Sequence, residues 1–144
     1  MNVEKEARDL IEIAVNTINE SGEIPPSLVI FREINGEISS AALDVEQYFA
    51  VPAKTPILKI LCKHAVKRNP SAVALLLVYH LRTTEPDTTK KDWIRVEAIK
   101  KDSQALFFAR LFKDGDRYSA GSVESDYEFE SAYTGRPFSP LEGV

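Results

Sequence analysis

AVALLLVYHLR, residues 72–82, is an almost continuous apolar run, and it decides the fold. A strand that is covered on both faces, or that lies in the middle of a sheet, has this composition. Its longest unbroken part, residues 72–79, is far shorter than the roughly 20 apolar residues that cross a bilayer. We therefore predict a central strand, no membrane span and no export signal.

The chain after this run is expected to form a meander of antiparallel strands. Residues 93–100 and 104–113 are rich in β-branched and aromatic side chains and are separated by a short polar turn. The pair Asp114-Gly115 then predicts a tight turn into a further strand at residues 118–123.

The chain before the run begins with a helix and a hairpin. Apolar residues recur at three- and four-residue steps over residues 3–18, which predicts an amphipathic helix. Residues 28–34 and 37–43 have strand composition, and Asn35-Gly36 between them favours a two-residue hairpin turn.

A second helix is expected to end near residue 68. Thr55 can cap it with its hydroxyl while Pro56 takes the first helical position, and an apolar stripe follows. Residues 44–53 have no clean period and are interpreted as a connector with one helical turn.

Together these elements predict an α+β domain of the order α-β-β-α-β-β-β-β, in which one mainly antiparallel sheet carries both helices on one face. This order is similar to the profilin-like and roadblock-type folds, in which a hairpin and a three-strand meander form one sheet flanked by helices. Members of those folds mostly act as binding or dimerisation modules, so the similarity implies an interaction function. We assign the domain to residues 1–123 and an acidic, aromatic tail to residues 124–144.

The composition is that of an ordinary folded domain. The 144 residues are 44% hydrophobic and 28% charged, which suffices for one full core. The net charge of -4 argues against nucleic acid as a partner. Cys62 is the only cysteine, which excludes an internal disulfide and the paired cysteines of structural zinc sites and favours the reducing cytoplasm.

Three soft ligands, Cys62, His64 and His80, raise the hypothesis of a metal or thiol site. Cys62 and His64 are two residues apart on the predicted helix, so they point to different sides of it. A third and a fourth ligand to join the Cys62 and His64 pair are also missing. We therefore favour a structural role for these residues and predict neither a metal nor another cofactor.

Polar side chains occur on two neighbouring predicted strands. His80 and Arg82 share one face of their strand, and Arg95 and Glu97 share one face of the next. If the two faces coincide, these four residues form a cluster that binds an anion or moves a proton, because such a histidine titrates near neutrality. Cross-strand ion pairs on a solvated face are the alternative, which we favour over catalysis.

Charge is divided unevenly along the chain. Lys59, Lys63 and Lys67 form a basic stripe, which we predict to contact a partner, and no acid occurs over residues 54–68. The tail combines acids with aromatic residues, which we predict to anchor a partner or a second copy, namely Tyr127, Phe129, Tyr133 and Phe138. Docking of the tail onto the chain's own basic helix, and a solvated tail without a partner, are the two alternatives.

The sequence contains no motif that requires catalysis, since no Ser or Cys lies in a strand-turn-helix elbow. We predict a cytoplasmic interaction module, a homodimer, whose exposed sheet edge or open sheet face joins a second subunit or a protein partner. The alternative is a small-molecule-binding protein or enzyme with a pocket between the second helix and the sheet, in which His80, Arg82 and Glu97 are the polar contacts.

Overall fold

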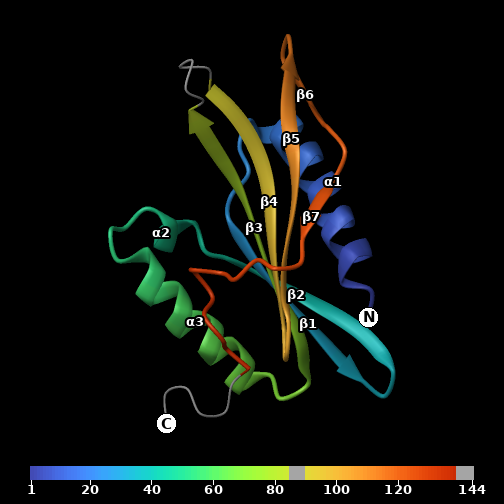
Figure 1. The fold of residues 1–144 in the computed structure, drawn as a ribbon, viewed down its shortest axis with the longest axis vertical. Helices are drawn as coiled ribbons and strands as arrows, with labels where there is room; N and C mark the ends of the chain where they lie inside the picture. The colour runs from blue at the N-terminus through green and yellow to red at the C-terminus, as the bar shows by residue number, and fades with distance from the viewer. Residues whose placement is uncertain (85–89, 139–144) are drawn as a thin grey trace.

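The computed structural model describes residues 1–84 and 90–138, which form three helices and seven strands (Figure 1). The helices are α1 (Val3–Ser21), α2 (Glu46–Phe49) and α3 (Lys54–Arg68). The strands are β1 (Ser27–Ile34), β2 (Glu37–Asp44), β3 (Ala72–Thr84), β4 (Lys90–Lys100), β5 (Gln104–Asp114), β6 (Arg117–Ala120) and β7 (Glu124–Asp126). The predicted order of helix, hairpin, helix and meander is confirmed, and α2 is the helical turn expected in the connector.

One antiparallel sheet contains all seven strands. Its order is β2-β1-β3-β4-β5-β6, and β7 pairs with the part of β5 that β6 leaves free. Because β3 lies between β1 and β4, the central position predicted for the apolar run is confirmed. The predicted α+β class is confirmed as well.

Short-range signals place the first helix and the hairpin. The Asn2 side chain accepts a hydrogen bond from the Lys5 N–H at 3.1 Å and so caps α1. Gly22 closes this helix with φ of 85°. Asn35 and Gly36 have φ of 54° and 80°, the left-handed values that a tight two-residue hairpin turn requires.

The prediction that Thr55 caps the second helix is wrong. Helix α3 begins at Lys54, and its N-cap residue, Ala53, makes no side-chain hydrogen bond. A capping side chain must precede the first turn, whereas Thr55 lies inside it. Pro56 is tolerated there because the first turn leaves its N–H groups without helical partners.

Helices α1 and α3 cover opposite faces of the sheet, so the prediction that both pack on one face is wrong. On β3, Leu76 and Val78 join α1 in one hydrophobic core, here called the α1-side core, and Leu75 and Leu77 join α3 in the other, the α3-side core. Figure 1 shows the sheet between the two helices. Since side chains alternate along a strand, an unbroken apolar run needs cover on both sides.

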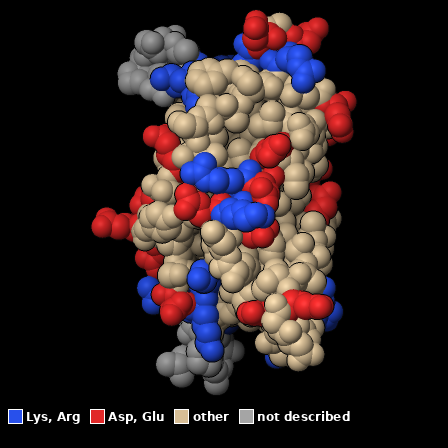
Figure 2. Space-filling view, turned by 90° about the vertical axis from the view of Figure 1, so that its right-hand side faces the viewer, with Lys and Arg blue, Asp and Glu red and all other residues tan. Residues whose placement is uncertain are grey.

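The surface on the α1 side of the molecule carries mixed charge. Figure 2 shows basic and acidic side chains next to one another there, and neither sign forms a continuous patch. Helix α1 contains two ion pairs of this kind, Lys5 with Asp9 at 3.1 Å and Arg8 with Glu4 at 3.0 Å. Across the described ranges, the helices are too short or too polar for any of them to span a membrane.

Candidate functional site

His80 and Arg82 lie on the α1 side of β3, where both contact Asp92 of β4. His80 Nε2 is 2.8 Å and Arg82 Nε is 2.9 Å from Asp92 Oδ1. Partial burial acts to raise the pKa of Asp92, but the hydrogen bonds and charges of Arg82 and His80 outweigh it and lower that pKa overall. Because Arg82 is exposed, this is a cross-strand surface ion pair, the interpretation favoured from the sequence.

Arg95 and Glu97 lie on the α3 side of β4, so the structure does not bring them to His80 and Arg82. The register pairs Arg95 directly with Tyr79, and paired residues point to the same side of a sheet. His80 follows Tyr79 and therefore points to the other side. The predicted four-residue cluster is two separate groups, and the ligand-binding role of its members stays a prediction.

The carboxylate of Glu97 is buried in the α3-side region and is held by two hydroxyl groups. Glu97 as a whole is only 1% exposed. Tyr79 Oη donates to Oε2 at 2.5 Å, and Ser131 Oγ donates to Oε1 at 2.5 Å. Burial, together with the charge of Glu97, raises the pKa of Tyr79 far above its usual range. Since a buried polar group must be hydrogen-bonded to be tolerated, these contacts fix the tail to the sheet.

Gln104 of β5 provides a second attachment for the tail. Its Oε1 accepts from the Ser131 N–H at 2.7 Å, and its Nε2 donates to the Gly135 carbonyl at 3.0 Å. Ser131 Oγ also accepts from the Thr134 N–H at 3.1 Å, which closes a local turn. We call Glu97, Gln104, Ser131 and Gly135 the tail clamp. Sequence reasoning missed Gln104 and Ser131, because a single serine in an acidic tail gives no signal of its partner.

All four aromatic residues predicted to bind a partner contact their own chain. Tyr127 contacts Phe107, Phe129 lies against Arg95, Tyr133 contacts Phe49 and Tyr79, and Phe138 packs against the α3-side core. Figure 1 shows the segment after β7 crossing the sheet and running along α3. Intramolecular docking, one of the alternatives weighed from the sequence, is therefore what the structure shows, and the partner-binding role of these residues stays a prediction.

The basic stripe of α3 lies beside the docked tail. Lys59 and Lys63 line a hollow of about 210 Å³ between α3 and residues 134–137. A Cβ atom at Gly135 would first meet the Lys59 side chain, whose Cγ would lie 3.5 Å away. Lys67 lies in the last turn of α3, where the helix dipole favours a cation. Lys59 and Lys63 thus lie beside the docked tail, and the predicted contact of the stripe with a partner is untested.

Cys62 and His64 point to different sides of α3, as the sequence predicts. Cys62 is buried, whereas His64 is exposed. Burial, and secondly the charge of Glu97, raises the pKa of the Cys62 thiol to about 12. Within residues 1–84 and 90–138 no three His, Cys, Asp or Glu side chains gather where they could hold a metal ion.

The stabilising contribution of Cys62 is expected to disappear at high pH. Its pKa is about 12 in the folded chain against an ordinary 9.0, so the folded state retains the thiol proton more tightly. This contribution is full below pH 9 and is lost as pH rises toward 12. Urea unfolding of the wild type and Cys62→Ala should show their free-energy difference falling by about 2 kcal/mol between roughly pH 8 and pH 11. A difference that does not change with pH would contradict this assignment.

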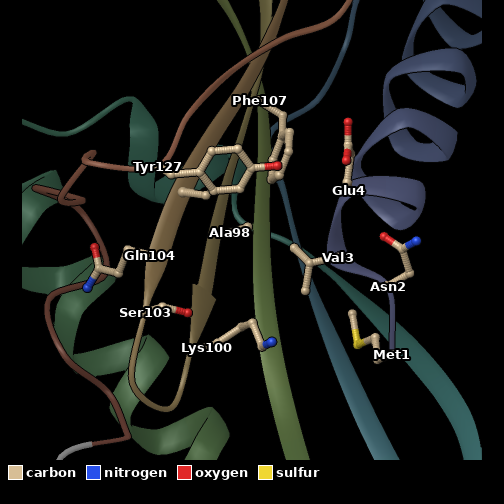
Figure 3. A pocket seen from close by; sticks show the side chains of 11 residues that line it. Met1, Asn2, Val3, Glu4, Ala98, Lys100, Ser103, Gln104, Phe107 and Tyr127 are labelled. Carbon is tan, nitrogen blue, oxygen red and sulfur yellow. The ribbon is translucent and has the colours of Figure 1, made fainter.

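A hollow of about 560 Å³ lies between the first turn of α1 and the β4–β5 hairpin (Figure 3). Two of its polar side chains already serve the fold. Asn2 caps α1, and Gln104, which Figure 3 shows turned away from Val3, holds the tail. Glu4 and Lys100 carry opposite charges, so this hollow does not select a ligand by charge.

Strand β2 forms one edge of the sheet, and all eight of its residues are exposed. Just past its end, the Val45 N–H donates to the Pro26 carbonyl at 3.0 Å. Backbone N–H groups alternate in direction along a strand, so the odd-numbered residues of β2 point toward β1. Ile38, Ser40 and Ala42 therefore direct their N–H and C=O groups to the outer edge, where no other strand of the described chain pairs.

No protein-family model, curated protein or solved structure matches this chain. The similarity in element order to profilin-like and roadblock-type folds therefore stays a prediction.

Proposed function

We propose that this chain is a cytoplasmic protein-interaction module that forms a homodimer by pairing its β2 edge with that of a second copy. The supporting observation is the exposure of all eight β2 residues together with the outward backbone groups of Ile38, Ser40 and Ala42. A two-fold axis perpendicular to the sheet would pair two β2 strands antiparallel and make one continuous sheet across both copies.

Strand β2 lacks the features that keep edge strands apart. Natural edges are protected by lysine, proline, bulges or inward-pointing charges. The β2 sequence, EISSAALD, contains no lysine or proline, and its register with β1 is unbroken from Ser27↔Asp44 to Ile34↔Glu37. Its two acids are its first and last residues, and residues 39–42 between them are small and uncharged. Two such strands can approach closely along their middle.

Exposed apolar side chains flank this edge. Ile34, Ile38 and Leu43 are 55%, 40% and 40% exposed. Burial of such side chains contributes roughly 25 cal/mol for each Å² of apolar surface removed from water. Pairing of two β2 edges would cover part of this surface and add to the backbone hydrogen bonds.

An edge-paired dimer is expected to persist at high salt, because backbone hydrogen bonds and apolar contacts are weakly screened. Association steered by the acidic tail would weaken instead. The full chain is needed for this comparison, since residues 131–135 are held by the tail clamp and removing them would uncover Glu97.

Light scattering at tens of micromolar is expected to give twice the 16.1 kDa chain mass for the wild type, and the single-chain mass for Ser40→Pro. Proline removes an outward N–H and disfavours edge pairing without removing a bond to β1. Ser40→Ala keeps that N–H and should remain dimeric.

The thermal unfolding of Ser40→Pro, measured at a concentration where the wild type is monomeric, should match that of Ser40→Ala within a few degrees. A monomeric wild type at tens of micromolar would overturn the dimer. A dimeric Ser40→Pro would overturn the β2 edge as its interface.

A further inference from the structure

Another hollow, of about 340 Å³, lies open on the α3 side of the sheet next to the part that the tail covers. Its volume is within the roughly 300–1,000 Å³ of small-molecule sites. Three strands line it, through Leu81 and Thr83 of β3, Trp93 and Arg95 of β4, and Leu106 and Phe108 of β5. The rings of Trp93 and Phe108 are 6.0 Å apart at 62°, so its floor is largely aromatic and apolar.

The polar groups of this hollow can donate hydrogen bonds. Trp93 Nε1 already donates to Thr83 Oγ1 at 3.1 Å, which leaves the Thr83 O–H free to donate. The buried Nε of Arg95 has no hydrogen-bond partner in the described part of the chain. A buried donor without an acceptor costs about 1–3 kcal/mol. A ligand would meet Arg95 through the part of its side chain that lines the hollow.

Aromatic rings fix the orientation of the Arg95 guanidinium. Its Cζ lies 5.7 Å from the ring centroid of Tyr79 and 5.7 Å from that of Phe129. The guanidinium lies over both rings, and the N–H groups along its edge are the donors that carboxylates pair with. A planar group held in this way is prepared to bind before the ligand arrives.

A second arginine adds positive charge beside the hollow. Arg110 Cζ lies 5.8 Å from the ring centroid of Trp93 and 5.1 Å from that of Phe112. Its buried Nε likewise has no hydrogen-bond partner within residues 1–84 and 90–138. Both arginines therefore favour an anion at this part of the sheet.

We propose that this hollow binds a small planar aromatic carboxylate. The ring of the ligand packs against Trp93 and Phe108, and its carboxylate accepts hydrogen bonds from Arg95 and Thr83. This binding activity is separate from dimerisation through β2, which lies at the far end of the sheet order.

Acidic residues at the margin restrict the ligand to one negative group. The β5–β7 register places Glu124 beside Phe108 and Asp126 beside Leu106, and both acids are exposed. A nucleotide or single-stranded nucleic acid would bring further phosphates against these carboxylates and be repelled. A single carboxylate that reaches Arg95 avoids this repulsion.

NMR titration with naphthalene-2-carboxylate tests the proposal. Trp93 is the only tryptophan, so its indole N–H gives one assigned signal inside the hollow. The carboxylate is expected to shift this signal and saturate it at millimolar concentration or below. Neutral naphthalene-2-carboxamide should bind about tenfold more weakly, because it lacks the charge-assisted hydrogen bonds.

Substitutions separate the charge from the apolar surface. Arg95→Gln should weaken carboxylate binding about tenfold and leave the carboxamide unchanged. Arg136→Gln is the matched control, since Arg136 is exposed and pairs with Glu130 at 3.0 Å, and it should bind like the wild type. The Ser40→Pro variant should also bind like the wild type, so failure of the dimer and failure of this site are distinguishable.

The amide spectrum of Arg95→Gln, outside the neighbourhood of residue 95, is the check that this variant is folded. If it is not, Arg95→Lys, which keeps a positive charge but loses the two-pronged donor, should bind with intermediate affinity. A Trp93 signal that does not move at millimolar carboxylate would overturn the site. Equal affinity for the carboxylate and the carboxamide would overturn the assignment to an anion.

Discussion

Replacing Phe107 by alanine is expected to lower the free energy of unfolding by about 4 kcal/mol. Phe107 is one of the largest fully buried side chains and lies in the α1-side core on β5. The substitution loses the transfer free energy of the ring and leaves a cavity that α1 and the sheet can fill only in part. It also removes the edge-to-face contact with Tyr127, whose ring centroid is 5.8 Å away. Urea unfolding followed by circular dichroism measures the change.

Phe112→Ala is the matched control for this substitution. Phe112 is the same residue type on the same strand, but it is 48% exposed and points to the other side of the sheet. Its loss is expected to cost about 1 kcal/mol or less, mostly through its contact with Arg110. If the two variants unfold at similar urea concentrations, the assignment of Phe107 to a tightly packed core is wrong.

The elements of the fold were predictable because their signals are local. The Asn35-Gly36 turn and the apolar stripe of α1 each involve residues close in sequence, and the structure places them as expected. The face of the sheet that each helix covers was not predicted correctly. Apolar residues at consecutive positions of β3 need cover on both sides, whereas the prediction placed both helices on one.

The candidate sites were predictable only in part. Their geometry depends on which side of the sheet each strand residue points to, and on residues distant in the sequence. His80, Arg82, Arg95 and Glu97 were identified as polar residues on adjacent strands, but the Tyr79↔Arg95 register places the two pairs on opposite sides. The main partner of Glu97 besides Tyr79 is Ser131, which is 34 residues further along the chain. Nothing in the local pattern of an acidic tail indicates such a contact.

The docked tail and the two proposed surfaces are linked by the same sheet. The tail clamp holds Phe129 and Tyr133 over one part of the α3 side, which leaves the hollow around Trp93 beside them. The β2 edge is separated from the strands of the hollow by β1. In these two proposals one sheet offers an edge to a second copy and a face to a small ligand, and the described residues that line the hollow all belong to β3, β4 and β5.

Glu97→Ala is expected to destabilise the chain by about 3 kcal/mol and to release the tail. The substitution leaves the Tyr79 and Ser131 hydroxyl groups, which now donate to Glu97, without their acceptor in a buried region. Each such donor costs about 1–3 kcal/mol, and the loss of the buried carboxylate offsets part of the total. Chymotrypsin should then cleave near Tyr133 faster than in the wild type, because the segment must leave the sheet to be cut.

Glu97→Gln separates the hydrogen bonds from the charge. The amide has nearly the same shape, and both hydroxyl groups can accept as well as donate, so Tyr79 and Ser131 keep partners. We expect its stability and its rate of chymotrypsin cleavage to stay closer to the wild type than to Glu97→Ala. If Glu97→Ala is as resistant to chymotrypsin as the wild type, the tail is held by Gln104 and aromatic packing alone, and the clamp does not depend on the buried carboxylate.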